Sequence, residues 1–381
     1  MKAVGDQLPD LLEAQQKQDR YRGCLLGGAV GDALGAPVEF MSHAEIIRKF
    51  GANGIDEYVP AYGKLGAITD DTQMTLFTAE GLLRVQVSAS APDVNAATGA
   101  IAQAYQRWFH TQGQSHPLQE PCLDGWLLEH RELHSRRGPG ITCLTGLKSM
   151  RHVTDLAKND SKGCGGVMRV APIGMYFASL ALAESRDRPR LLTQAFDLAC
   201  KAAAITHGHP TGQLASGAFA AIIMELLLGE PLSGAINAVL PLLAAKPRHE
   251  ETTEAIQAAC RLAAEMPIDI DALAQLGEGW VAEEALAIAL YCALSTEDFR
   301  SGVVLAVNHN GDSDSTGSMA GQLLGALHGV QVIPGAWLEP LELRGVIETM
   351  ADDLLKFRDT GLNKSQSDKV HVPHSSEFPN V

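Results

Sequence analysis

The sequence lacks the cysteine spacing of a disulfide framework or a zinc site. Its 7 cysteines are spread along 381 residues, and no two of them are separated as C-x-x-C. An odd number of scattered cysteines predicts reduced thiols in an intracellular protein. Residues 1–20 contain no apolar core, so we also expect no secretory signal peptide. These absences together predict a cytoplasmic protein.

Basic charge and long apolar runs are scarce as well. The chain has 30 Lys+Arg against 45 Asp+Glu, a formal net charge of -15. This balance argues against nucleic acid and against a polybasic membrane contact. The longest apolar run, 214–228, contains Glu225 and is too short to span a membrane. We therefore expect neither a nucleic-acid nor a membrane partner.

Aromatic residues make up only 5% of the chain, and alternating β-branched runs are few. Alanine and leucine dominate the 46% of hydrophobic residues, which favours helices and suffices for a full core. No linker or internal repeat divides the helical pattern. The predicted fold class is therefore all-α, a single large multi-helix domain over 20–359. A polar N-terminal extension, 1–19, and a flexible C-terminal tail, 360–381, are expected to flank it.

The strongest helical patterns cover 21–34, 72–85, 92–111, 191–205, 213–228, 251–265, 281–294 and 315–329. In the first and the last of these, glycines recur at near-helical spacing (Gly27, Gly28 and Gly31; Gly317, Gly321 and Gly325). A glycine inside a helix costs about 1 kcal/mol relative to alanine. Close approach of helix backbones is the simplest explanation for this cost.

The first motif with chemical potential is Thr69-Asp70-Asp71-Thr72, which precedes an apolar stretch. An ordinary capped helix start explains it on its own, because threonine is a good N-cap and acids suit the positive end of the helix dipole. Two adjacent carboxylates nevertheless repel each other unless water or a cation neutralises them. The motif is therefore also a candidate cation site.

The second motif, 310–317, contains Asp312, Asp314 and Ser315 and opens another apolar helix. An EF-hand loop beginning at Asp312 is excluded, because its twelfth position is Leu323 and not glutamate. An acidic helix cap remains the alternative. If the two motifs faced each other, their carboxylates and hydroxyls would select Mg, Mn or Ca over Zn or Cu. Such a two-metal site can hold a diol or a phosphate and activate a water molecule.

Four further segments are less specific. The glycine-rich loop 160–169 has no Walker spacing; its amides suit a phosphate or a simple turn. The His-x-His of 206–212 fits a hydrogen-bonding turn better than a metal site. Trp280, in a turn leading into a helix, is either a core residue or a base-stacking one. Glu39, which follows the first helix, is either a surface charge or a site residue.

Six segments, in this order, resemble the ADP-ribosylglycohydrolase family, and their motifs are closest to the ADP-ribosylarginine hydrolases. They are Gly27–Gly35, Thr69–Thr72, Arg137–Gly140, Gly163–Arg169, Thr206–Gly212 and Gly311–Thr316. The resemblance extends over about 21–329 and implies an all-α domain. Serine at 315 and the H-x-H-P-T-G segment are similar to the arginine-specific branch.

The resemblance also implies roles for individual residues. The ligands of two divalent cations, Mg²⁺ or Mn²⁺, would be Thr69, Asp70, Asp71, Asp312, Asp314 and Ser315, with Asp314 as the bridge. The pyrophosphate would be held by the backbone amides of the loop 161–165, through Ser161, Gly163, Cys164 and Gly165. His207 would border this pocket, and Trp280 would lie against the adenine. Asp70 or Asp71 would help to deprotonate the attacking water, and Glu39 matches a mobile glutamate that could protonate the leaving nitrogen.

The implied activity is metal-dependent hydrolysis of the N-glycosidic bond between ADP-ribose and a protein side chain, most simply arginine. The substrate would be an ADP-ribosylated protein. Another linkage, such as serine or a free ADP-ribose derivative, is an alternative. So is an immunity protein that binds and neutralises an ADP-ribosyltransferase toxin, with the extension 1–19 as the contact. Against pure binding, all the implied ligand positions are filled.

Overall fold

The computed structural model describes residues 4–85, 93–115, 117–118, 122–183 and 187–357. Within these ranges it is built from helices, and its β-structure is limited to two isolated bridges, Ala61 with Lys64 and Gly163 with Val281. The predicted all-α class and single large helical domain are confirmed. The α-helices are α1 (Val4–Gly35), α2 (His43–Phe50), α3 (Asp70–Leu83), α4 (Val94–Thr111), α5 (Ile141–Ser149), α6 (Ala171–Ala183), α7 (Arg188–Ala204), α8 (Pro210–Leu227), α9 (Leu232–Ala244), α10 (Glu250–Glu265), α11 (Ile270–Gln275), α12 (Ala282–Ser295), α13 (Phe299–Val307), α14 (Ser313–His328), α15 (Gly335–Leu338) and α16 (Arg344–Lys356). Four short 3₁₀ helices are η1 (Trp126–Glu129), η2 (Arg131–His134), η3 (Cys164–Gly166) and η4 (Val330–Val332).

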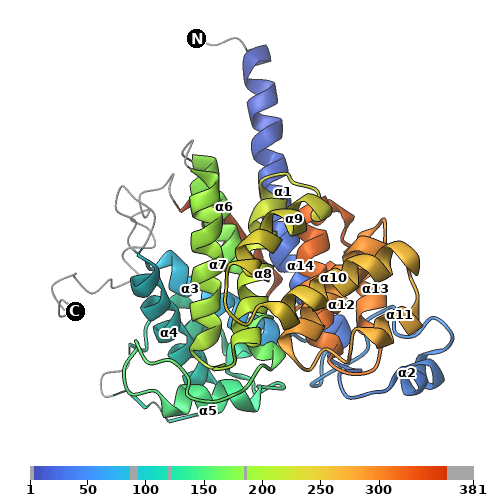
Figure 1. Ribbon diagram of the computed structural model, residues 1–381, viewed down its shortest axis with the longest axis horizontal. Coiled ribbons are helices and arrows are strands. Elements are labelled where there is room, and N and C mark those ends of the chain that lie inside the picture. Colours follow the sequence, from blue (N-terminus) through green and yellow to red (C-terminus); the bar gives the residue numbers. More distant parts are fainter. Residues whose placement is uncertain (1–3, 86–92, 116, 119–121, 184–186, 358–381) are drawn as a thin grey trace.

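Helices α1 and α14 pack against each other at the centre of the body (Figure 1). Glycines line their contact in pairs: Gly23 with Gly325, Gly27 with Gly321, and Gly31 with Gly317. A Cβ atom on Gly31 would collide with the backbone of Gly317, and the other pairs behave alike. The close helix contact predicted from the glycine spacing is therefore present. It offsets the helical cost of these glycines.

The glycine contact also determines what lies at one end of the helix pair. Gly35, the last residue of α1, abuts the backbone of Ser313 and Asp314, where α14 begins. Because no side chain separates the two helices there, the end of α1 and the start of α14 meet backbone to backbone. Asp32 and Glu39, near the end of α1, are thus brought to the acidic start of α14.

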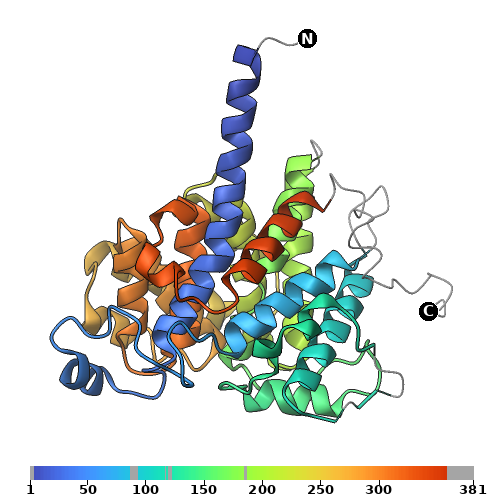
Figure 2. The same cartoon turned by 180° about the vertical axis from the view of Figure 1, so that it is seen from behind.

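Helix α1 is longer than the sequence patterns indicated. It runs unbroken from Val4 through the expected boundary between residues 19 and 20, and its N-terminal part projects from the body (Figures 1 and 2). Side-chain contacts to the body begin with Gln18 and Arg22, which both donate to the carboxylate of Asp352 on α16. The expected tail, 360–381, lies outside the described residues.

Two apolar stretches are explained by core packing. The run 214–228 lies in α8, and its Glu225 is buried and paired with Arg188. The stretch Cys164–Leu182 is long and apolar enough to cross a membrane, but 83% of its most apolar window is buried inside the body. Helix α6, which forms most of this stretch, packs against α3, α7 and α8. Burial within the protein accounts for its hydrophobicity.

Candidate functional site

The start of α3 is held in place by a side chain from α1. Thr69 is the N-cap, and its side chain accepts a hydrogen bond from the Asp71 amide. The buried carboxylate of Asp32 accepts from the amides of Thr69, at 3.0 Å, and Thr72, at 3.2 Å, and from the Thr72 hydroxyl. Two of the donors that a helix start leaves unpaired are thereby satisfied by a residue outside the helix. Asp32 thus fixes where Asp70 and Asp71 lie.

The loop before α5 holds Asp70 from the other side. Its carboxylate accepts from the Gly140 amide at 3.1 Å, and its own amide donates to the Arg137 carbonyl at 3.1 Å. The Arg137 side chain is buried against Glu342, which also binds Lys64 and the Ile68 amide. This ion-paired cluster anchors the segment that contacts Asp70.

The start of α14 carries the second acidic motif. Asp312 is the N-cap residue, and its amide donates to the Glu278 carbonyl at 2.8 Å. Gly311 has φ +115, and a Cβ at this position would strike Glu278. Only glycine suits this turn, which brings α14 against the loop 277–281. Asp314 lies in the first turn of α14 and accepts from the Ser315 amide at 3.0 Å.

The two acidic helix starts converge. Carboxylate oxygens of Glu39, Asp312 and Asp314 lie within 4.8 Å of one another. A Cβ atom built on Gly138 would lie 3.6 Å from Asp70 Oδ1 and 3.7 Å from Glu39 Oε2, which places the start of α3 beside the same group. Asp71, also buried, has one oxygen, Oδ1, without a hydrogen-bond partner in the described structure. We refer to Glu39, Asp70, Asp71, Asp312 and Asp314 as the acidic cluster.

Crowded carboxylates perturb one another's protonation. Burial, and then the charge of Asp314, raises the pKa of Glu39 to about 10 and that of Asp32 to about 7. The pKa of Asp70 is well above its usual value, first through burial, and so is that of Asp71. The pKa of Asp312 is raised in the same way. Five buried or half-buried acids in one place require protons or cations to balance their charge.

This donor set fits hard divalent cations. All the ligating atoms are carboxylate or hydroxyl oxygens, the type that Mg²⁺ and Mn²⁺ prefer. The orphaned Oδ1 of Asp71 supports the assignment, because a buried carboxylate oxygen without a donor is costly unless a cation contacts it. Ser315 follows Asp314 in the first turn of α14, and its hydroxyl contacts the Cys164 sulfur. Glu39, expected from the sequence to act on substrate, lies as close to Asp312 and Asp314 as a ligand would.

Cys164 bridges the acidic cluster and the glycine loop. Its thiol donates to Oδ2 of Asp312 at 2.7 Å, and Ser315 Oγ lies 3.7 Å from its sulfur. Burial, and then the neighbouring Asp312, keeps its pKa well above the usual value, so the thiol remains protonated. Its backbone amide donates to the Trp280 carbonyl at 3.1 Å and is not free for a phosphate in this structure. The sequence indicated the loop position of Cys164 but not its contact with Asp312.

The rest of the predicted phosphate loop lies beside His207. The Gly163 amide is 3.4 Å from Ser161 Oγ, and the Ser161 hydroxyl also contacts Thr142. A Cβ built on Gly163 would lie 3.5 Å from His207 Nε2, and one on Gly165 would lie equally close. Bare glycine backbone therefore faces the imidazole. The loop and His207 are therefore adjacent.

The His207 ring is neutral and oriented. Its Nδ1 lies 2.8 Å from the Thr206 hydroxyl, which in turn accepts from Arg169. Burial, and then the nearby Arg169 charge, lowers the pKa of His207 to about 3. At neutral pH this side chain offers a hydrogen-bonding nitrogen toward the loop without adding positive charge.

Trp280 lies at the edge of the site and stacks on Phe40, the residue after Glu39. It is 37% exposed, so it is not a core residue. Sequence reasoning did not identify Asp32, Phe40 or Glu342 as contributors to the site. For Asp32 there was a signal, an acid among small residues in the last turns of an otherwise apolar helix.

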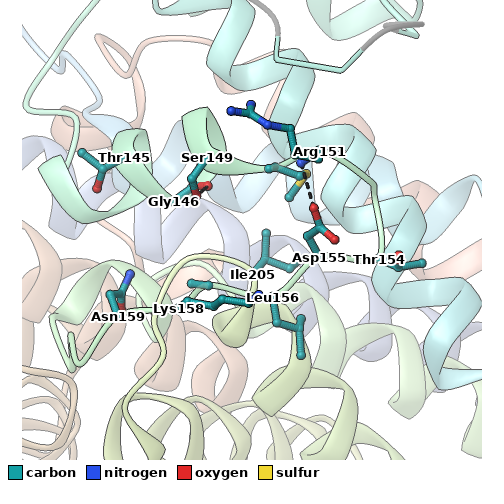
Figure 3. A pocket seen from close by; sticks show the side chains of 12 residues that line it. Thr145, Gly146, Ser149, Arg151, Thr154, Asp155, Leu156, Lys158, Asn159 and Ile205 are labelled. Carbon is teal, nitrogen blue, oxygen red and sulfur yellow. Dashed lines mark hydrogen bonds between the residues drawn. The ribbon is translucent and has the colours of Figure 1, made fainter.

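A separate hollow of about 710 Å³ lies between α5 and the loop 150–159 (Figure 3). Its lining includes Thr145, Ser149, Arg151, Leu156 and Lys158, and none of the acidic cluster. Asn159, at its edge, accepts from the amides of Ser161 and Gly208 and so connects the hollow to the back of the phosphate loop. The acidic cluster and this hollow are distinct features.

Comparison with known proteins identifies relatives over the whole helical body. The family model described as ADP-ribosylglycohydrolase matches residues 13–362. An ADP-ribosyl-[dinitrogen reductase] glycohydrolase of Rhodospirillum rubrum is 28% identical over 86% of this chain and 91% of its own. An ADP-ribosylarginine hydrolase Tri1 of Pseudomonas putida is 24% identical over 90% of this chain and 80% of its own.

A solved structure, described as an ADP-ribosylglycohydrolase-related protein complex, has the same fold. Its TM-score is 0.61 at 28% identity, with 90% of this chain and 99% of the other covered. The match spans the elements that contribute to the acidic cluster, from α1 to α14. The helical architecture around the cluster is thus shared with this relative.

Proposed function

The chain belongs to the ADP-ribosylglycohydrolase family, whose members hydrolyse ADP-ribose linkages, and from this we propose that it removes ADP-ribose from arginine side chains of modified proteins. The observation that carries the proposal is the grouping of Glu39, just after α1, with Asp312 and Asp314 at the start of α14 within 4.8 Å of one another, beside Asp70 at the start of α3. Four more facts agree with it: the orphaned Asp71 oxygen, the Cys164 thiol on Asp312, the neutral His207, and the glycine backbone beside it.

Two divalent cations, Mg²⁺ or Mn²⁺, complete the proposed site. Thr69, Asp70, Asp71, Asp312, Asp314 and Ser315 would hold them. When bound, the cations neutralise the carboxylates and supply Lewis acidity toward the ribose hydroxyls and the attacking water. The protein contributes rigidity, because Asp32 and the Gly140 amide hold the α3 acids in place before any cation binds.

The residues around the cluster would orient the substrate. The pyrophosphate lies along the loop 161–165, where Gly163 and Gly165 present bare backbone and His207 presents Nε2. The amides of Ser161, Gly163 and Cys164 already donate to Asn159, to Ser161 Oγ and to Trp280, so the Gly165 amide and the Ser161 hydroxyl are the better phosphate donors. This arrangement directs the distal ribose toward the acidic cluster and the adenosine away from it.

The bond-breaking step resembles glycoside hydrolysis. A water molecule loses its proton to Asp70 or Asp71, and its oxygen forms a bond to the anomeric carbon. The bond from that carbon to the guanidine nitrogen breaks through an oxocarbenium-like transition state. The departing nitrogen takes a proton from Glu39, the carboxyl group at the edge of the cluster. One proton leaves the water and one reaches the leaving group, so the step balances.

Linkage preference is the finer part of the proposal. Ser315 after Asp314, and the H-x-H-P-T-G segment beginning at His207, support arginine. A panel of defined substrates, linked through arginine or serine, together with free ADP-ribose derivatives, tests this preference. We expect release of ADP-ribose from arginine to be at least about tenfold faster than from serine, equal to about 1.4 kcal/mol of transition-state discrimination. Faster release from serine would contradict the arginine assignment and leave the hydrolase class intact.

The projecting part of α1 supports a proposal about partners. Leu12 on this part is 54% exposed, and the helix leaves the body here. We propose that the extension 1–19 contacts a protein partner, for which an ADP-ribosyltransferase toxin is a candidate. The protein would act on its modified substrates in the cytoplasm.

A further inference from the structure

Two exposed aromatic rings from distant parts of the chain stack at the site. Phe40 is 78% exposed and Trp280 is 37% exposed. Their ring centroids are 5.6 Å apart and their planes are inclined by 15°. An exposed phenylalanine gains little from burial in this position, so its contact with Trp280 requires an explanation of its own.

The Trp280 side of the stack is rigidly attached to the acidic cluster. The Trp280 carbonyl accepts from the Cys164 amide, and its indole N–H donates to Glu278 at 3.2 Å. The Glu278 carbonyl accepts from the Asp312 amide at 2.8 Å. The indole is therefore a fixed wall joined through the backbone to Asp312.

The Glu39 carboxylate itself has few stabilising contacts. Among the described residues, no hydrogen bond to the Glu39 carboxylate is found. Its nearest neighbours in the cluster, Asp312 and Asp314, are also acids, which disfavour its charged form. The backbone turn has short-range bonds only, from Val38 to Gly35 and from Met41 to Val38. Val38, before Glu39, is buried in the core, and the His43 amide donates to Asn310; Phe40, after Glu39, is the neighbouring side chain that contacts the indole of Trp280.

We propose that Phe40 is a positioning residue, whose stacking on Trp280 holds the Glu39 carboxylate against Asp312 and Asp314. The inference rests on the proposed function, in which the acidic cluster binds divalent cations and hydrolyses the ADP-ribose linkage. When the stack opens, the turn carrying Glu39 is released and the indole becomes more exposed. The aromatic pair thereby couples assembly of the acidic cluster to the exposure of Trp280.

The stack is tested first in the cation-free protein by acrylamide quenching of tryptophan fluorescence. Trp108 and Trp337 are fully buried, and a Trp126→Phe background removes the half-buried remaining indole. Phe40→Ala should increase quenching of Trp280, whereas Phe40→Tyr keeps a ring in place and should not. Val332→Ala, which truncates an exposed apolar side chain on η4, serves as the matched control.

Kinetics then show whether Phe40 acts through Glu39. Phe40→Ala should lower kcat about two- to tenfold with little change in KM, a size typical of one aromatic pair. In a Glu39→Gln background the same substitution should change kcat less than about twofold, because the group it positions has already been altered. Phe40→Tyr should restore the activity.

Three results would overturn the inference. Unchanged quenching in Phe40→Ala would show that the stack does not cover Trp280 in solution. An equal kcat loss in the Glu39→Gln background would show that Phe40 acts without Glu39. A rise in KM in both backgrounds would mean that Phe40 contacts substrate instead.

If the wild-type protein hydrolyses no linkage, the proposed function fails, but Mn²⁺ titration still tests the role of Phe40. Phe40→Ala must then weaken Mn²⁺ binding in the wild-type background and not in Glu39→Gln.

Discussion

Single residues outside α3 and α14 fix the acidic starts of these helices. The Asp32 side chain on α1 accepts hydrogen bonds from two amides and a hydroxyl at the start of α3, and the Glu278 backbone carbonyl accepts one from the Asp312 amide at the start of α14. Motif reasoning predicted which acids belong together but not these supports. An acceptor that comes from a distant part of the chain produces no pattern in the sequence around the amides that donate to it.

Substituting Asp32 tests this support. Asp32→Ala leaves the buried amides of Thr69 and Thr72 without an acceptor, and each orphaned donor costs about 1–3 kcal/mol. We expect the free energy of unfolding to fall by about 2–4 kcal/mol in urea denaturation. Asp32→Asn retains one acceptor oxygen and should lose clearly less. Equal losses in the two variants would contradict the role of the carboxylate oxygens as acceptors.

Glu342 predicts a pH dependence of stability. Burial alone would raise its pKa, but hydrogen bonds and charge from Arg137 and Lys64 outweigh burial and lower it below its usual value. A lowered folded-state pKa gives stability that is present above the unfolded pKa of about 4.3 and is lost as pH falls through the folded pKa. Glu342→Gln leaves Arg137 buried without a charge partner and should cost about 3 kcal/mol at pH 7.

The measurement is urea denaturation of the wild type and Glu342→Gln between pH 7 and pH 3. The difference between them should be constant above about pH 5 and shrink below pH 4.5, the ordinary value for the group. Glu348→Gln, on the exposed face of α16, provides the control with little effect at either pH. A difference that stays constant down to pH 3 would show that Glu342 is not stabilised in its charged form.

At the scale of elements, the sequence predicted helices better than their starts. The apolar stretches of α3 and α14 were assigned, yet both helices begin two residues before the predicted positions, at Asp70 and Ser313. The helical pattern alone began after the acids, whereas the capped helix start considered for each motif places them in the cap and first turn, where they are found. The crossing of α1 and α14, which brings those starts together, was indicated only by glycine spacing.

The glycine contact yields the element-level prediction. Gly31→Ala places a methyl group against the backbone of Gly317, so the helices must separate despite alanine's better helix propensity. We expect a loss of about 1–3 kcal/mol in unfolding free energy, together with lower activity because the start of α14 shifts. Gly99→Ala in α4 is the matched control, because nothing lies within 4 Å of the added atom.

For Gly99→Ala we expect a gain of about 0.5–1 kcal/mol, the intrinsic preference for alanine in a helix. Both values come from thermal or urea unfolding of purified variants. Should Gly31→Ala stabilise the protein as much as Gly99→Ala does, the helices would not be in backbone contact in solution.

On the scale of the whole molecule, the excess of acidic residues limits which anionic partners the protein can bind. The net charge of -15 disfavours nucleic acid as a partner. It does not disfavour ADP-ribose, because in the proposed site the acidic cluster would bind cations and backbone amides would face the phosphates. The sequence could assign these acids through their motifs, but their burial and the Phe40–Trp280 stack depend on tertiary packing.

The projecting part of helix α1 can be deleted to test whether hydrolysis depends on it. Deleting residues 1–15 removes the projecting part and leaves Gln18 and Arg22 on Asp352. We expect hydrolysis to stay within about twofold of the full chain, since no residue of the acidic cluster is touched. Binding of a protein partner, measured by titration with a purified ADP-ribosyltransferase toxin, should weaken. Loss of hydrolysis on deletion would place this segment in the functional core instead.

The central claim is that the acids at the starts of α3 and α14 hold divalent cations for hydrolysis of ADP-ribosylarginine. The most direct measurement is the rate of ADP-ribose release from an ADP-ribosylarginine protein as Mg²⁺ or Mn²⁺ is added to chelator-treated enzyme, for the wild type, Asp312→Ala and Asp314→Ala. We predict that release by the wild type requires the cation and that it falls by at least about 10³-fold in either variant, about 4 kcal/mol of transition-state stabilisation. Full activity in chelator, or undiminished activity in both variants, would contradict the account.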